Sequence, residues 1–80
     1  MLQVKLFARA RQLVGQPQVG IPWSDGDSVL RLKEQLSVLY PCLAPAMSGL
    51  LVAVNNEYAH DSVLINTGDE VACFPPVSGG

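Results

Sequence analysis

The residues of this chain with the clearest chemical potential stand at its end, where a glycine pair follows a proline-rich lead-in. They are Pro75, Pro76, Val77, Ser78, Gly79 and Gly80. Glycine has no Cβ, so a di-glycine end is the slimmest peptide that can pass through a narrow channel. Prolines disfavour continuation of a central strand and stiffen an extended segment, and residues 74–80 would reach about 23–25 Å when extended. We therefore expect a projecting peptide whose terminal carboxylate is the reacting group.

A glycine-rich end can also be a frayed tail without a function, because the terminal residues of domains are often poorly ordered. Here the tail continues directly from an apolar strand pattern that ends at Phe74, with no linker or tag sequence in between. The residues favour a functional tail, and the frayed end stays open as the alternative.

Composition indicates one small domain. The 80 residues leave no room for a second core, and 49% of them are apolar. An apolar share this high suggests that some apolar side chains face a partner. The first residues lack the basic and apolar regions of a signal peptide, and no apolar run approaches the roughly 20 residues that cross a membrane. We expect a cytoplasmic protein with no membrane partner.

Charge and motif content argue against several classes of function. Five basic and seven acidic residues give a net charge of −2, and only Arg9 and Arg11 lie close together, so nucleic acid is not expected as a partner. Cys42 and Cys73 lack metal-ligand spacing and are not expected to form a disulfide in the cytosol; Cys73 fits a buried strand and Cys42 a turn. The only histidine, His60, is interpreted as a surface residue. With no phosphate-binding loop or catalytic triad, the chain is expected to bind neither a metal nor a cofactor.

Hydrophobic periodicity predicts several strands. Residues 2–8 alternate as a half-buried strand whose core face carries Leu2, Val4, Leu6 and Ala8. Residues 9–15 fit a short helical turn that ends at a glycine. Further strands are predicted at 18–23, 50–54, 57–59 and 70–74, with a loop at 24–27 and turns at 55–56 and 66–69.

One helix is clear. Ser28 is a suitable N-cap, and the proline after Tyr40 ends the helix. An apolar stripe runs between them at spacings of three, four and three residues, formed by Val29, Leu32, Leu36 and Leu39. Burying this stripe contributes about 6–12 kcal/mol before entropy is counted, so the helix must lie on a sheet. The expected fold is an α+β roll in which a mixed sheet of about five strands packs on one main helix, with the N- and C-terminal strands adjacent at its centre.

Several sequence blocks occur together with this order of elements: Leu6-Phe7-Ala8, Arg11, Leu13-Val14-Gly15, Ala53-Val54-Asn55, residues 67–72 and residues 74–80. Together they resemble the ubiquitin-like β-grasp superfamily and, within it, the small sulfur-carrying subunits of molybdopterin synthase. The terminal block is specific, the helix is generic, and residues 40–50 match loosely. The resemblance implies a β-grasp domain over residues 1–74 and an extended reactive tail over residues 75–80.

The resemblance also implies a function for the tail, in which Gly80 carries sulfur as a thiocarboxylate. A ubiquitin-activating-like adenylyltransferase would use ATP to convert the Gly80 carboxylate to an acyl-adenylate, and a persulfide on a sulfur donor protein would displace AMP. The large catalytic subunit of the synthase would accept the tail and move its sulfur to a cyclic pyranopterin precursor. The chain would then be a carrier whose catalysis lies on its partners.

Three side chains are candidates for the partner interface. Alternation along the last strand puts Phe74 on the face opposite Cys73, beside the tail, where an aromatic residue suits a partner contact. A core position for Phe74 stays open. Phe7 lies off the core face of its strand and either joins Phe74 or lies apart from it. Arg11 matches the family pattern and is interpreted either as a partner of an acidic residue on the large subunit or as a solvated side chain.

Two other functions stay open. The first is sulfur carriage by the same fold for thiamine thiazole or for tRNA thiolation, which the Phe-Pro-Pro-Val-Ser lead-in fits less well. The second is a β-grasp binding module whose glycines do not react. That second function predicts that trimming or extending the chain at Gly80 changes nothing.

Overall fold

The structure is a computed structural model that describes residues 1–75. Its strands are β1 (Leu2–Leu6), β2 (Gln18–Ile21), β3 (Asp27–Ser28), β4 (Leu51–Val54), β5 (Glu57–Ala59), β6 (Leu64–Ile65) and β7 (Val71–Phe74). Its helices are α1 (Ala8–Val14), α2 (Val29–Leu39), a 3-10 turn η1 (Pro41–Leu43) and α3 (Ala44–Met47).

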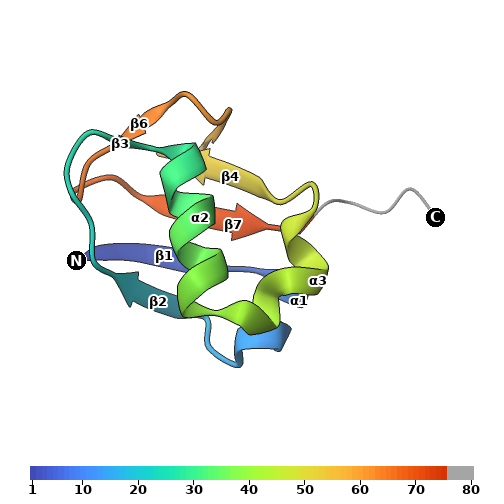
Figure 1. Cartoon of the computed structure of the whole chain (residues 1–80). Helices are drawn as coiled ribbons and strands as arrows, with labels where there is room; N and C mark the ends of the chain where they lie inside the picture. The colour runs from blue at the N-terminus through green and yellow to red at the C-terminus, as the bar shows by residue number, and fades with distance from the viewer. Residues whose placement is uncertain (76–80) are drawn as a thin grey trace.

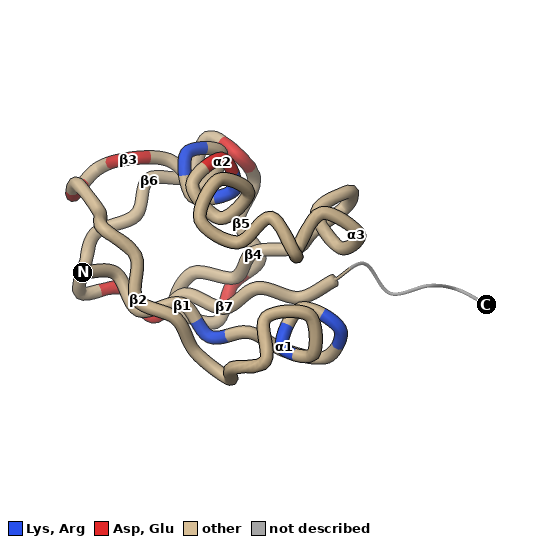
Figure 2. Tube along the Cα trace, turned by 60° about the horizontal axis from the view of Figure 1, so that its bottom comes forward, with Lys and Arg blue, Asp and Glu red and all other residues tan. Residues whose placement is uncertain are grey.

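Five strands form one mixed sheet in the order β2-β1-β7-β4-β5. β1 and β7 lie side by side at the centre and run parallel, whereas the other neighbouring pairs are antiparallel. α2 crosses one face of this sheet: it passes in front of the strands in Figure 1 and lies on one side of them in Figure 2. The predicted roll, with one main helix and adjacent terminal strands, is therefore confirmed. The face of the sheet that points away from α2 is called the open face below.

The core lies between the sheet and α2. Its buried side chains include Leu2, Val4 and Leu6 from β1, and Val29, Leu32 and Leu36 from α2. The Ser28 hydroxyl accepts a hydrogen bond from the Arg31 N–H at 3.2 Å, so the predicted N-cap is confirmed.

Leu39 was predicted on the buried stripe, and this is wrong because the residue is 46% exposed. The helix ends at this residue, so its last turn lies at the rim of the sheet. Leu43 from η1 is buried in the core instead.

Ala8 was predicted on the core face of the first strand, and this is also wrong. β1 ends at Leu6, and Ala8 is exposed with a φ of 51° where the chain turns into α1. The second strand is shorter than predicted as well, since β2 stops at Ile21.

A second, two-stranded sheet was not predicted. Asp27 and Ser28, part of the predicted loop and the helix cap, pair as β3 with Ile65 and Leu64 of β6. Two residues carry no periodicity, so this pairing leaves no signal in the sequence. The Trp23 indole N–H donates to the Ile65 carbonyl at 2.9 Å and holds this small sheet against the main one.

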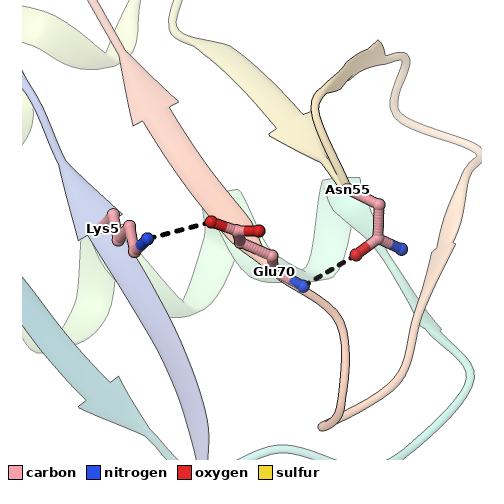
Figure 3. A network of polar contacts seen from close by, with 3 residues as sticks. All are labelled: Lys5, Asn55 and Glu70. Carbon is pink, nitrogen blue, oxygen red and sulfur yellow. Dashed lines mark hydrogen bonds and ion pairs between the residues drawn. The ribbon is translucent and has the colours of Figure 1, made fainter.

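The predicted turn between β4 and β5 is confirmed, and it is tied to the start of β7. Asn55 and Asn56 have φ values of 51° and 70°, which suits asparagine in a tight hairpin turn. Asn55 Oδ1 accepts from the Glu70 N–H at 2.9 Å (Figure 3). Asn55 Nδ2 donates to Asp69 Oδ1 at 3.1 Å. Hydrogen bonds from the Asn66 N–H and from Asn55 lower the pKa of the Asp69 carboxyl below its usual value. Polar contacts thus hold together the end of β4 and the start of β7, which are far apart in the sequence.

Replacing Asn55 should therefore destabilise the fold. Asn55→Ala loses both side-chain hydrogen bonds and puts at positive φ a residue that tolerates this conformation less well than asparagine, so the free energy of unfolding should fall by about 1–3 kcal/mol. Asn55→Gly loses the bonds but keeps the backbone conformation, so its loss should be smaller. Urea titration measures both, with Asn56→Gly as the control. An unchanged midpoint for Asn55→Ala would show that these bonds add nothing.

The two cysteines lie in different environments, as the sequence predicted. Cys73 is buried in β7, and burial raises the pKa of its thiol to about 12, whereas Cys42 is exposed on η1. Because the thiolate is the reacting form, iodoacetamide should modify Cys42 in the native protein and Cys73 only after unfolding. Mass spectrometry of the native and denatured protein counts the adducts. Equal labelling rates of the two thiols would contradict the burial of Cys73.

Candidate functional site

The tail leaves the domain where β7 ends. Phe74 is the last residue of β7, and the proline that follows it is half-buried. In both views the end of β7 lies next to α1 and α3, at the opposite end of the sheet from the N-terminus (Figure 1, Figure 2). The remaining predicted tail residues lie outside the described residues: Pro76, Val77, Ser78, Gly79 and Gly80. The division into a domain and a reactive tail therefore stays a prediction.

An aromatic pair stands beside this exit. The rings of Phe7 and Phe74 are stacked, with centroids 4.8 Å apart and planes 9° from parallel. The Phe7 N–H donates to the Cys73 carbonyl at 3.2 Å, which continues the β1–β7 ladder past the end of β1 and keeps Phe7 next to Phe74. Of the two interpretations of Phe7 that the sequence left open, the structure shows the one in which it joins Phe74. Phe74 is half-buried on the open face, opposite buried Cys73, so the predicted alternation of β7 is confirmed too.

Two further side chains enlarge this site, and the sequence analysis missed them. The Tyr58 ring meets Phe74 edge-on, with centroids 6.3 Å apart, and is 73% exposed. Leu51 pairs with Phe74 across β4 and β7 and is 38% exposed. Phe7, Leu51, Tyr58 and Phe74 together are called the aromatic patch below. Strand alternation could have placed Leu51 and Tyr58 on the open face, but only the register brings them to Phe74.

Next to the aromatic patch the open face is hollowed. The hollow has a volume of about 270 Å³ and is lined by Phe7, Ala53, Asn56, Tyr58, Glu70, Ala72 and Phe74. The two alanines face each other across β4 and β7, and they lie between longer side chains. This space is called the alanine hollow below. It gives the open face a place for a protruding side chain of another molecule.

Arg11 lies on α1, at the same end of the sheet as the exit of the tail. Its backbone N–H donates to the Phe7 carbonyl at 3.4 Å, and its carbonyl accepts from the Gly15 N–H at 2.8 Å. The side chain is exposed, and it forms no ion pair with any residue in the part of the chain that the structure describes. Figure 2 shows the basic residues of α1 near the end of β7. Both interpretations of Arg11 remain open, since only a partner distinguishes them.

Residues 1–75 contain neither a helix long and apolar enough to span a bilayer nor a cluster of three metal-ligating side chains. His60 is exposed, as predicted.

A family model matches residues 4–80 of this chain, almost its whole length, and it is the model of the ThiS family. The chain belongs to the ThiS family. The resemblance found in the sequence blocks is thereby confirmed at the level of the family, and the match includes the positions of the terminal glycines.

Two curated relatives of this ThiS-family chain carry the same name. The molybdopterin synthase sulfur carrier subunit of Arabidopsis thaliana is 37% identical over 79 residues, which cover 99% of this chain and 82% of that protein. The protein of the same name from Escherichia coli is 35% identical, and the similarity covers 100% of both chains.

Solved structures of the same fold complete the comparison. The crystal structure of SAMP1, small archaeal modifier protein 1, from Haloferax volcanii superposes with a TM-score of 0.83 at 29% identity, covering 99% of this chain and 98% of that one. The fold of this ThiS-family chain is the ubiquitin-like β-grasp. Its aromatic patch, alanine hollow and tail exit all lie on or beside the open face of that fold.

Proposed function

We propose that this chain is the sulfur carrier subunit of a molybdopterin synthase. The observation that carries the proposal is the similarity, over 99% and 100% of this chain, to sulfur carrier subunits from a plant and a bacterium. The terminal glycine pair supports it, since a carrier needs a slender end that another protein can accept. The proposal includes a cytoplasmic location, where thiols are kept reduced.

The chemistry proposed for the tail takes place on the Gly80 carboxylate. A carboxylate is a poor electrophile, so an adenylyltransferase of the ubiquitin-activating type first transfers AMP from ATP to it and releases pyrophosphate. The terminal sulfur of a donor persulfide then attacks the carbonyl carbon, and AMP leaves. A second thiol attacks the sulfur–sulfur bond of the acyl disulfide, which frees the thiocarboxylate at Gly80. The chain supplies the carbonyl group, and its partners supply ATP binding, the sulfur and the thiol.

The aromatic patch is the proposed contact with the large catalytic subunit. It places exposed apolar side chains, Phe7 and Tyr58 among them, directly beside the point where the tail leaves the sheet. Aromatic side chains dominate the energetics of interfaces, and a partner that covers this patch also receives the tail. The partner then holds the cyclic pyranopterin precursor and carries out catalysis.

Mass spectrometry of the intact chain tests the carrier role. After incubation with ATP, the activating enzyme and a persulfide donor, the mass should rise by the difference between one sulfur and one oxygen atom. Omission of ATP should leave the mass unchanged. Adding the large subunit and the precursor should then return the mass to its starting value and form molybdopterin. Charging with sulfur but no molybdopterin would favour the carriers for thiazole or tRNA thiolation, and no charging at all would favour a binding module.

A second candidate function is the covalent modification of proteins. It is favoured by the name of the superposed archaeal protein, which describes a modifier. In that function the activated Gly80 carbonyl would be attacked by a lysine amine of a target and would form an isopeptide bond. A stable isopeptide as the main product during turnover, in place of the regenerated carboxylate, would support the modifier over the carrier.

A further inference from the structure

The floor of the alanine hollow is built by the register of the sheet. Ala72 of β7 pairs with Lys5 on one side and with Ala53 of β4 on the other, and Ala53 pairs in turn with Tyr58 of β5. These four side chains form one row across the open face. The two in the middle end at Cβ, while Lys5 and Tyr58 at the outside are long. The surface of the open face is therefore lower at the two alanines than at Lys5 and Tyr58.

The walls of the hollow differ in chemistry from one end to the other. At the end nearer the tail stand the stacked rings of Phe7 and Phe74, and the Tyr58 ring lies at the side. At the other end stand Glu70 and Asn56. Lys5 Nζ contacts Glu70 Oε1 at 2.9 Å (Figure 3). The Glu70 side chain remains 53% exposed. Within the described residues no hydrogen bond engages Glu70 Oε2, so that oxygen can accept from a donor outside the chain.

These features decide which side chain fits best. An aliphatic side chain would fill the space but would cover Glu70 Oε2 without giving that oxygen a hydrogen-bond donor, which is costly. An arginine places its methylene stem on the alanines, stacks its planar guanidinium against the Tyr58 ring at the side of the hollow, and donates to Glu70 and Asn56. A lysine offers a compact point charge that stacks less well. The net charge of −2 on the chain also favours a cationic side chain in the hollow.

We propose that the alanine hollow receives the side chain of one arginine of the large subunit, held by the aromatic patch and by Glu70. This inference rests on the proposed function, because it names the partner chemistry of the same docking face. It adds an anchor point of defined charge to an otherwise apolar contact, and so fixes the orientation of the partner relative to the exit of the tail.

Isothermal titration of the purified large subunit with variants of this chain tests the arginine. Glu70→Gln keeps the shape and removes the charge, so the Kd should rise about tenfold or more and should depend less on salt. Ala72→Leu fills the floor and should raise the Kd about thirtyfold or more. Lys5→Met removes the ion pair between Lys5 and Glu70 but leaves the Glu70 charge in place for the arginine, so the Kd should not rise. Gln3→Leu, which adds an apolar residue elsewhere on the open face, should bind as the unaltered chain does, and thermal melts check the folding of every variant.

The outcomes separate this inference from the function on which it rests. Weakening by Glu70→Gln without weakening by Lys5→Met supports the arginine, and an arginine-to-methionine scan of the large subunit should then give one variant whose loss is not additive with Glu70→Gln. Weakening by Ala72→Leu alone would mean that an apolar side chain of the large subunit enters the hollow. That result would refute the arginine but would leave the docking face in place. Normal binding by both Glu70→Gln and Ala72→Leu would place the hollow outside the interface and would overturn the inference. Failure of the unaltered chain to bind would refute the proposed function together with this inference.

Discussion

Adding one alanine after Gly80, or deleting Gly80, is expected to abolish molybdopterin formation without changing the fold or the first encounter with the large subunit. The reason is geometric, because the reacting carbonyl must come within about 3–3.5 Å of the group that attacks it. One residue moves the end of an extended chain by about 3.3–3.6 Å, so the carbonyl no longer lies within reach of the attacking group. An alanine also brings a Cβ to a position where glycine passes freely. We expect a loss of at least about a hundredfold in each variant.

The assay combines the large subunit, the activating enzyme, a sulfur donor and the precursor, and it measures molybdopterin. The matched control adds one alanine before Met1, whose side chain is 72% exposed at the opposite end of the sheet from the exit of the tail (Figure 1). This control should retain full activity. Full activity in either tail variant would refute the carrier function and would favour the binding module whose glycines do not react. A lowered melting temperature in a tail variant would mean that the end also supports the fold.

Much of the fold could be predicted because its signals are local. Ser28 and the apolar residues that follow it specify the start and the buried face of α2, and both were found. The face of Phe74 followed from simple alternation, since β7 is regular and its other face is buried. The stacking of Phe7 on Phe74 was one of two open interpretations, because it depends on the parallel pairing of β1 with β7.

The remaining features could not be predicted because they depend on register or on where a chain turns. Leu39 fits the apolar stripe, but the helix ends there, and nothing in the periodicity shows that Leu43 takes the buried place. Tyr58 and Ala53 reach the candidate site only through the pairing of β4 with β5 and β7. The alanine hollow is a consequence of two small residues meeting across strands that lie far apart in the sequence. A single sequence does not specify such cross-strand neighbours.

Phe74→Asp should weaken binding to the large subunit by about 2 kcal/mol or more, which corresponds to a Kd about thirtyfold higher. Phe74 contacts both Phe7 and Tyr58, so the substitution removes the centre of the aromatic patch and leaves a charge at the exit of the tail. The core should remain, because Val71 and Cys73 of the same strand keep their buried positions. Loss of the stacked pair costs the fold only about 0.5–1.5 kcal/mol beyond the area that it buries.

Calorimetric titration beside a thermal melt separates binding from folding, and Val38→Asp is the matched control. Val38 is 79% exposed on α2, which covers the face of the sheet away from the aromatic patch, so the same change of chemistry there should leave the Kd unaltered. Comparable weakening by both variants would mean that added negative charge alone repels the partner. If the melt of Phe74→Asp collapses while its folded fraction binds normally, Phe74 supports the fold and the contact with the large subunit lies elsewhere. A normal melt with weakened binding places the partner on the open face, where it covers the aromatic rings and receives the tail from the same side.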